Sequence, residues 1–226
     1  MSLPDPTTAA DQKLALKSQL RAEALARRDA LAPDARAAAA EAVADRPLPV
    51  WISADLIVSG YAPIRSEFNP LPLLRRFADA GARLALPAIA GRGRPLIMRA
   101  WEFGVPLVRG QWGIREPGPN APEGLPGIVI APLAAFDRRG YRIGYGAGYF
   151  DMTIASLRER KPVTAIGVAF AAQEIPGVPA FDYDQRLDFV LTEREVIDCR
   201  ADPQSPLVPA KAGIQDRDSG FPLAQE

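Results

Sequence analysis

The alternation of short apolar runs with helix-like segments constrains the fold of this chain most. The apolar runs, several of them rich in β-branched residues, occupy 55–61, 83–87, 96–101, 127–131, 163–170 and 188–192. The run at 127–131 is the most convincing central strand, because it is continuously apolar and bounded by turn residues. Strands joined through helices pair in parallel and carry helices on both faces. We predict a single α/β domain with three αβα layers and a mostly parallel central sheet.

The predicted helices and the ends of the domain follow from turn residues and composition. We expect helices over 11–30, 34–44, about 69–81 and about 148–160. Residues 201–226 contain Pro, Ser, Gly and Lys without periodicity, which is typical of disorder. We therefore predict a flexible N-terminus over 1–10, a folded domain over 11–200 and a disordered tail over 201–226.

Composition excludes several classes of function. The chain has no histidine, so Ser-His-Asp triads and most zinc-hydrolase sites are excluded. Its 27 basic and 27 acidic residues balance, which argues against nucleic-acid or membrane partners. Cys199 is the only cysteine and the N-terminal segment lacks a secretion pattern, so we expect a cytoplasmic protein. Catalysis must rest on carboxylates, Lys, Arg, Tyr, backbone amides or a hard metal ion.

A glycine-rich stretch over 136–151, FDRRGYRIGYGAGYFD, follows the strongest predicted strand and precedes a helix. Ligands of open α/β sheets bind at such positions. Gly144, Gly146 and Gly148 leave backbone amides uncovered, and amides leading into a helix N-terminus attract anions. Arginines that could contact a bound phosphate follow in the same stretch: Arg138, Arg139 and Arg142. Asp151 is placed to hold a Mg²⁺ ion that bridges phosphates.

The residues alone leave other interpretations open. The G-x-G-x-G string is neither a Walker A loop nor a dinucleotide fingerprint. The glycines could serve only a turn with positive φ angles, and Asp151 could serve only the helix dipole. Lys17 and Arg21 lie four residues apart on one helix face, and spacing alone favours a solvated basic face.

Residues 132–151 resemble the signature F-D-x-x-G-x-R-L-G-x-G-x-G-Y-Y-D of the 5-formyltetrahydrofolate cyclo-ligase family. Further matches occur in the family's order over about 12–195: KSQLR at 17–21, Glu67 after the first strand, QWGIREP at 111–117 and LDFVLTE at 187–193. The resemblance implies a ligase that uses ATP and Mg²⁺ to convert 5-formyltetrahydrofolate into 5,10-methenyltetrahydrofolate. ADP and phosphate are released, and the formyl oxygen is phosphorylated on the way. The implied partners are the reduced folate and ATP, with a monomer or weak dimer as the expected state.

The resemblance also implies roles for individual residues. It assigns ATP binding to Lys17, Ser18, Gln19, Leu20, Arg21, Arg142, Ile143, Gly144, Tyr145, Gly146, Ala147, Gly148, Tyr149 and Phe150. It assigns folate binding to Ala62, Glu67, Trp112, Tyr145, Gly148 and Tyr149, with Glu67 on the pterin and Trp112 stacked on a flat ring. It assigns the metal to Asp151 and Asp188, and catalysis to Arg142, Tyr149 and Asp151.

Three positions depart from the family pattern. Ala147 stands where Lys or Gly is usual, Phe150 replaces the second tyrosine of Y-Y-D, and Tyr183 stands where bacterial members often have His. These departures keep two alternatives open: a non-enzymatic folate- or nucleotide-binding paralogue, and a sugar-phosphate isomerase-like enzyme on a similar scaffold. Product formation from the folate and ATP discriminates between the three functions.

Overall fold

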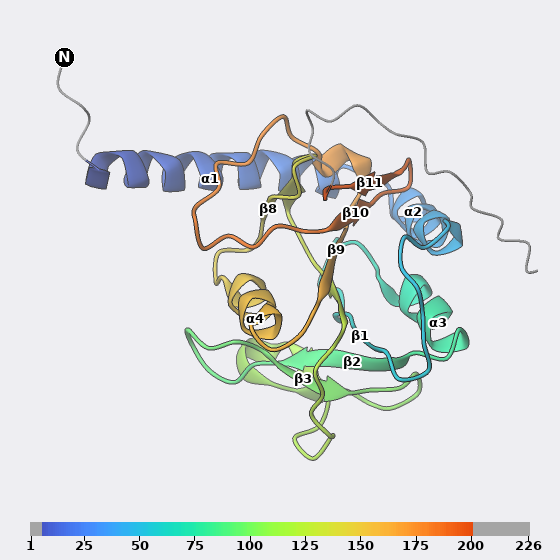
Figure 1. Cartoon of the computed structure of the whole chain (residues 1–226). Coiled ribbons are helices and arrows are strands. Elements are labelled where there is room, and N and C mark those ends of the chain that lie inside the picture. Colours follow the sequence, from blue (N-terminus) through green and yellow to red (C-terminus); the bar gives the residue numbers. More distant parts are fainter. Residues whose placement is uncertain (1–5, 201–226) are drawn as a thin grey trace, which may run out of the picture.

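The computed structural model of this chain describes residues 6–200 (Figure 1). The predicted tail over 201–226 and the first five residues of the predicted N-terminal segment lie outside this range. Helix α1 (Pro6–Asp29) begins five residues earlier than predicted, so 6–10 are helical. Within the described residues, no helix is long and apolar enough to cross a membrane.

A seven-stranded sheet forms the middle layer, in the order β11-β10-β9-β6-β1-β2-β3. Its strands are β1 (Ile57–Ser59), β2 (Arg83–Ala88), β3 (Ile97–Ala100), β6 (Ile128–Ala131), β9 (Thr164–Val168), β10 (Phe189–Leu191) and β11 (Val196–Asp198). The five inner strands pair in parallel, and the edge strands β3 and β11 pair antiparallel with their neighbours. Strand β6 is the central strand. The prediction of a mostly parallel sheet is confirmed.

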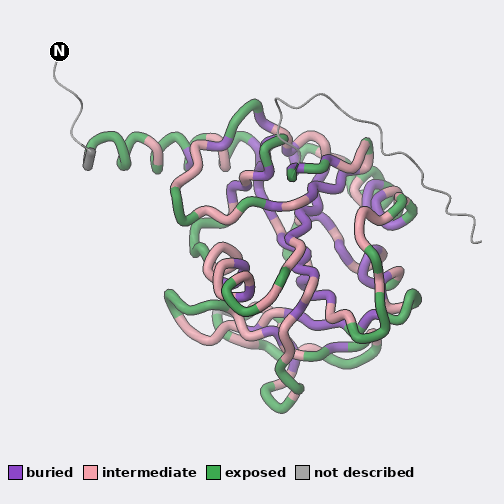
Figure 2. Tube along the Cα trace, in the orientation of Figure 1, coloured by how far each residue is buried: buried purple, intermediate pink, exposed green. Residues whose placement is uncertain are grey.

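Helices cover both faces of this sheet, as predicted. Helices α2 (Pro33–Asp45) and α3 (Leu71–Asp79) pack on one face and α4 (Tyr149–Arg158) on the other (Figure 1). The alternation along β6 explains the two cores: Ile128 and Ile130 join the cluster under α2 and α3, whereas Val129 joins the cluster under α4. Figure 2 shows these buried segments running through the middle of the molecule.

Helix α1 lies across one end of the sheet instead of covering a face. Its C-terminal half packs on a small hairpin of β7 (Ala135–Phe136) and β8 (Arg142–Ile143), where Ala24 shares a buried cluster with Ile143. Its first turns extend beyond the body of the protein (Figure 1). The helix therefore presents one face to the glycine-rich turn that follows β8.

Several short elements have no clear signal in the sequence. They are β4 (Val108–Arg109), β5 (Arg115–Glu116), the hairpin of β7 and β8, β11, and the 3₁₀ turns η1 (Gln111–Gly113) and η2 (Ala171–Gln173). Helix α3 begins at Leu71, two residues after the predicted cap. Asn69 still serves this helix start, because its Oδ1 accepts a hydrogen bond from the Leu71 amide at 3.1 Å.

Candidate active site

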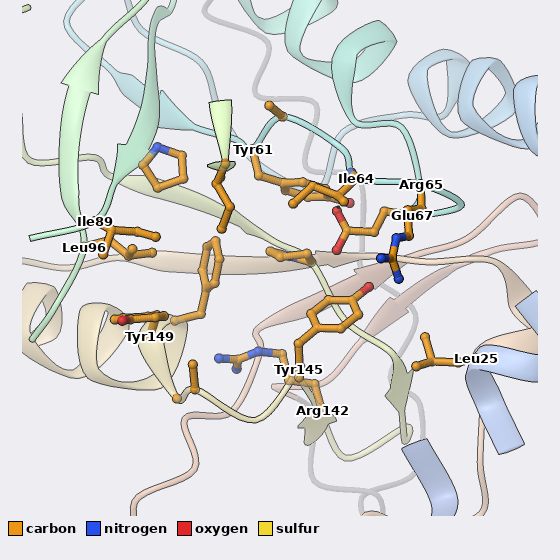
Figure 3. Close-up of a pocket in the computed structure, with 18 of the residues that line it drawn as sticks. Leu25, Tyr61, Ile64, Arg65, Glu67, Ile89, Leu96, Arg142, Tyr145 and Tyr149 are labelled. Carbon is orange, nitrogen blue, oxygen red and sulfur yellow. Dashed lines mark hydrogen bonds between the residues drawn. The ribbon is translucent and has the colours of Figure 1, made fainter. Parts of the chain in front are cut away.

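A cavity of about 510 Å³ opens beyond the carboxyl ends of β1, β2 and β6 (Figure 3). Its walls come from α1, the segment after β1, the loops around β2 and β3, and the glycine-rich turn with the start of α4. One end is apolar and includes Ile89 and Leu96; the other end carries Glu67 and Tyr145 (Figure 3). A cleft of this size at this edge of a parallel sheet is typical of a small-molecule site.

The glycine-rich turn forms one wall of the cavity. Gly148 caps α4 with φ 67°, and Gly146 has φ 103°, so both adopt the left-handed region that favours glycine. Gly148 makes no side-chain capping bond, and the N-terminus of α4 that follows it is the kind of helix end that attracts anions. The backbone of the turn therefore requires glycine at Gly146 and Gly148, and the position of the turn at the cavity also suits phosphate binding.

Replacing Gly146 by alanine is expected to lower the free energy of unfolding by about 1–2 kcal/mol. The reason is backbone strain alone, because an added Cβ at Gly146 meets no atom within 4 Å. Gly144 is the matched control: its Cβ would also be in open space, but its φ is not positive. Urea unfolding of the two alanine variants checks this, and equal stabilities would contradict it.

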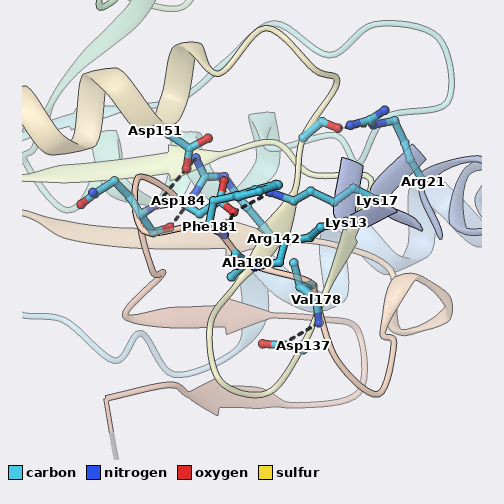
Figure 4. Close-up of polar contacts among 12 residues, drawn as sticks. Lys13, Lys17, Arg21, Asp137, Arg142, Asp151, Val178, Ala180, Phe181 and Asp184 are labelled. Carbon is cyan, nitrogen blue, oxygen red and sulfur yellow. Dashed lines mark hydrogen bonds and ion pairs between the residues drawn. The ribbon is translucent and has the colours of Figure 1, made fainter. Parts of the chain in front are cut away.

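Arg142, from β8, holds a charged cluster beside the turn (Figure 4). Its side chain is 3% exposed, and Nη2 donates to Asp151 Oδ1 at 3.0 Å while Nη1 donates to the Gln185 carbonyl at 2.8 Å. Asp184 lies close enough to act on the same guanidinium, and Lys17 of α1 contacts Asp184 Oδ2 at 2.5 Å. Burial lowers the pKa of Arg142, and the two carboxylates oppose this shift. The cluster thus combines two carboxylates with two cations.

The structure does not bring Asp188 to this cluster. Its Oδ2 accepts from Arg158 at 2.9 Å and from the Ala165 amide at 2.7 Å, next to the start of β9. Arg158 is the last residue of α4, whereas Asp151 belongs to the first turn of that helix. Asp188 therefore lies towards the amino ends of the strands, at the edge opposite the cavity.

Asp184 is the functional candidate that the sequence analysis missed. It lies in the same acidic motif, DYDQRLD, as Asp188. Spacing alone does not tell which carboxylate of this motif turns towards Asp151. The motif therefore indicates an acidic site but does not identify the residue that serves it. Within residues 6–200, no group of three or more acidic or cysteine side chains could hold a metal alone.

Glu67 stands at the other end of the cavity, half-buried in the loop after β1. Its Oε2 accepts from the Ile64 amide at 2.9 Å, and the Tyr145 hydroxyl lies close enough to lower the pKa of the carboxyl. Figure 3 shows that hydroxyl pointing towards Glu67. Burial raises the pKa of Glu67, and its hydrogen bonds together with the nearby Arg28 partly offset the rise.

Most residues expected to bind ligands gather around the cavity. Those lining it are Ala62, Glu67, Arg142, Gly144, Tyr145, Ala147, Gly148, Tyr149, Phe150 and Asp151. Lys17 and Arg21 approach from α1, where Arg21 Nε donates to the Gly144 carbonyl at 2.7 Å. Lys17 and Arg21 therefore make contacts within the protein, whereas spacing alone favours a solvated basic face.

Other expected residues lie away from the cavity. Ser18 and Gln19 are exposed on α1, Leu20 packs against the cluster under that helix, and Ile143 is fully buried in it. Arg138 and Arg139 pair with carboxylates outside the cavity: Glu174 and Glu195 for the first, Asp137 for the second. The Trp112 side chain lies outside the described part of the structure, so its stacking role stays a prediction.

Comparisons with known proteins agree with these features. A family model described as the 5-formyltetrahydrofolate cyclo-ligase family matches residues 13–193. A 5-formyltetrahydrofolate cyclo-ligase of Mycolicibacterium smegmatis is 32% identical over 194 residues, which are 80% of this chain and 95% of that protein. The enzyme of the same name from Escherichia coli K12 is 28% identical over 181 residues, 75% of this chain and 96% of that protein. The solved 5,10-methenyltetrahydrofolate synthetase of Aquifex aeolicus superposes with a TM-score of 0.67 at 28% identity, covering 88% of this chain and all of that one.

Proposed function

This chain belongs to the 5-formyltetrahydrofolate cyclo-ligase family of enzymes, and we propose that it uses ATP and Mg²⁺ to cyclise 5-formyltetrahydrofolate to 5,10-methenyltetrahydrofolate. The reaction releases ADP and phosphate and passes through a phosphorylated formyl group. The observation that carries this proposal is one cavity with the glycine turn and cations along one wall and a half-buried carboxylate, Glu67, at one end. Both substrates need neighbouring sites, because phosphate must pass from one to the other.

ATP is proposed to bind along the glycine turn, with its phosphates facing the N-terminus of α4, where the helix dipole favours negative charge. Lys17 and Arg21 add positive charge from α1. Arg21 already contacts the turn through the Gly144 carbonyl, so its guanidinium is held where phosphate oxygens are expected. Phosphoryl transfer depends mainly on positioning and on neutralising charge. A chain without histidine is therefore equipped for it.

Asp151 and Asp184 are the proposed Mg²⁺ ligands in place of the pair Asp151 and Asp188. Magnesium prefers oxygen donors and commonly takes one or two carboxylates together with substrate phosphates and water. The donor set fits, since both carboxylates face the same Arg142 guanidinium and both described hydrogen bonds of Asp151 end on Oδ1. The ion would neutralise charge on the phosphates. Arg142 and the Gln185 amide orient the Asp151 carboxylate for this role.

The reduced folate is proposed to bind at the other end of the cavity. The Glu67 carboxylate accepts hydrogen bonds from the amino and amide donors of the pterin, and Ala62, Gly148, Tyr145 and Tyr149 contact the ring and the formyl group. The apolar side chains of Ile89, Leu96 and Phe150, which line the same cavity, would limit the access of water to the activated formyl carbon. The folate supplies its own nucleophile, the nitrogen at position 10. The protein therefore needs only to hold this nitrogen close to the activated formyl carbon.

Incubating the purified protein with 5-formyltetrahydrofolate, ATP and Mg²⁺ tests the proposal. We expect methenyl product, followed by its near-ultraviolet absorbance, in a one-to-one ratio with ADP. Product formation without ATP, or folate binding without turnover, would overturn it. The second outcome would instead support a non-enzymatic folate-binding paralogue. Turnover of a phosphosugar without ATP would support the isomerase-like alternative.

We also propose that the protein acts in the cytoplasm, as a monomer or weak dimer, without nucleic-acid or membrane partners. The equal numbers of basic and acidic residues support the absence of nucleic-acid and membrane partners. Sedimentation at micromolar concentration distinguishes the monomer from a stable oligomer.

Arg21→Gln is expected to raise the KM for ATP about tenfold, because the variant loses a charged contact to the turn and to phosphate. The KM for the folate should change little, since Arg21 does not line the Glu67 end of the cavity. Arg27→Gln is the matched control: Arg27 is an exposed arginine of the same helix that donates to the Ala172 carbonyl, outside the cavity. Steady-state kinetics with each substrate varied in turn check this, and an unchanged KM for ATP would contradict it.

A further inference from the structure

Arg28 is a buried arginine that neither the family signature nor the proposed reaction assigns to any role. It lies on α1 with 5% of its surface exposed and lines the cavity at the Glu67 end. A buried guanidinium is costly unless it is paired and hydrogen-bonded. Its partners therefore indicate what the position does.

These partners belong to two separate segments of the cavity wall. Arg28 Nη1 donates to the Tyr145 hydroxyl oxygen at 2.7 Å, and Nε donates to Asp29 Oδ1 at 3.3 Å. Asp29 in turn accepts a hydrogen bond from Ser66, the neighbour of Glu67 in the loop after β1. Arg28 thus connects α1 to the glycine turn directly and to the Glu67 loop through Asp29.

The Tyr145 hydroxyl lies between Arg28 and Glu67. Its oxygen accepts from Arg28, so its own hydrogen is left for the Glu67 carboxylate, towards which the hydroxyl points (Figure 3). A chain of donors then runs from Arg28 through Tyr145 to Glu67. Such a chain fixes the rotamers of both side chains and favours the ionised carboxylate.

We propose that Arg28 is a positioning residue for folate binding, which holds Tyr145 and the Glu67 carboxylate in the orientation that receives the pterin. This inference rests on the proposed function, because it takes the Glu67 end as the folate end. Arg28 acts through these two side chains and does not contact the phosphates. Its loss should therefore affect the folate and leave ATP binding unchanged.

The charge of Arg28 also bears on the pH dependence. The groups that act on Glu67 are Arg28 from α1, Tyr145 from the glycine turn and Tyr61 from its own segment, and Asp29 and Arg65 line the same cavity. Arg28 lowers the pKa of Glu67 against the effect of burial. Removing its charge raises that pKa further, so the ionised carboxylate forms only at higher pH. The acid limb of kcat/KM for the folate should then move to higher pH.

Three variants test this inference: Arg28→Gln, Arg28→Lys and the neighbouring control Arg27→Gln. Arg28→Gln should raise the KM for 5-formyltetrahydrofolate about 10- to 100-fold, with little change in the KM for ATP, and should shift the acid limb upward. Arg28→Lys keeps the charge but loses the bond to Tyr145, so it should raise the KM for the folate and keep the acid limb of the wild type. Arg27→Gln should match the wild type in every parameter.

The outcomes separate this inference from the proposed function. An inactive wild type overturns the proposed function and with it the inference. An active wild type with Arg28→Gln indistinguishable from Arg27→Gln overturns the inference alone. Equal rises in the KM for folate and for ATP would also overturn it, because they indicate a general structural defect. If thermal unfolding shows that Arg28→Gln does not fold, the test rests on Arg28→Lys. A wild-type KM for the folate in Arg28→Lys would contradict the proposal.

Discussion

Asp151→Asn is expected to lower kcat by about 10³-fold while the protein stays folded. The substitution removes the negative charge that is proposed to hold Mg²⁺ beside the phosphates. It keeps an oxygen that can accept from Arg142 and from the Gln185 amide, which now share Oδ1. Alanine is a poorer test, because it would remove the ion-pair partner of the buried Arg142, and breaking a buried ion pair costs about 3–5 kcal/mol. Single-turnover kinetics at saturating ATP and folate measure the effect.

Two further variants decide which carboxylate is the second ligand. Asp184→Asn should also lower kcat strongly, because Asp184 faces Arg142 together with Asp151. Asp188→Asn should retain most activity, since its partners are Arg158 and the Ala165 amide outside the cavity. Each variant also needs a Mg²⁺ titration, in which the metal concentration for half-maximal rate should rise only for Asp151 and Asp184. Wild-type turnover in Asp151→Asn, or a larger defect in Asp188→Asn, would refute this assignment.

Glu67→Gln is expected to raise the KM for 5-formyltetrahydrofolate about 100-fold, with a much smaller effect on the KM for ATP. Glutamine has the same shape, but its amide replaces an acceptor oxygen with a donor and removes the charge. The pterin donors would then face a donor, and a polar group left unpaired in a buried site is costly. Initial rates over a range of folate concentrations at saturating ATP give the KM and kcat separately.

Glu159→Gln is the matched control for this prediction, because Glu159 is exposed just beyond the end of α4 and does not line the cavity. It should leave both KM values as in the wild type. If Glu67→Gln lowers kcat and leaves the KM for folate unchanged, Glu67 acts in the chemical step and not in binding. Isothermal titration of the folate without ATP provides an independent measure of the same loss.

The layers of the fold are predictable from the sequence, because the pattern of apolar residues that indicates each strand or helix lies within that segment. The run at 127–131 is apolar on both faces, which indicates burial on both sides, and β6 is the central strand with separate cores above and below it. The glycine turn is likewise predictable, because closely spaced glycines indicate a turn with positive φ angles. Gly146 and Gly148 have such angles. The hairpin of β7 and β8 has only two residues in each strand, which is too short to give a pattern.

The site is less predictable, because its charged groups meet across long stretches of chain. Arg28 lies on the same face of α1 as Lys17 and Arg21, eleven and seven residues further along, but that spacing alone does not show what the face packs against. Which acid of the DYDQRLD motif faces Asp151 depends on how the segment before β10 crosses α1. What α1 packs against and which acid faces Asp151 are both set by tertiary contacts, which no local sequence pattern encodes.

The ion pair between Lys17 and Asp184 joins residues 167 positions apart, and this separation has a consequence for synthesis. A ribosome makes α1 first and reaches residue 184 on the order of 10–30 s later, at about 5–20 residues per second. During that interval, the charged and apolar faces of α1 have no partners from the last third of the chain. The nascent protein therefore cannot assemble the cluster around Arg142 until the segment before β10 has been translated. Activity should appear abruptly, when nearly all of the described chain is free to fold.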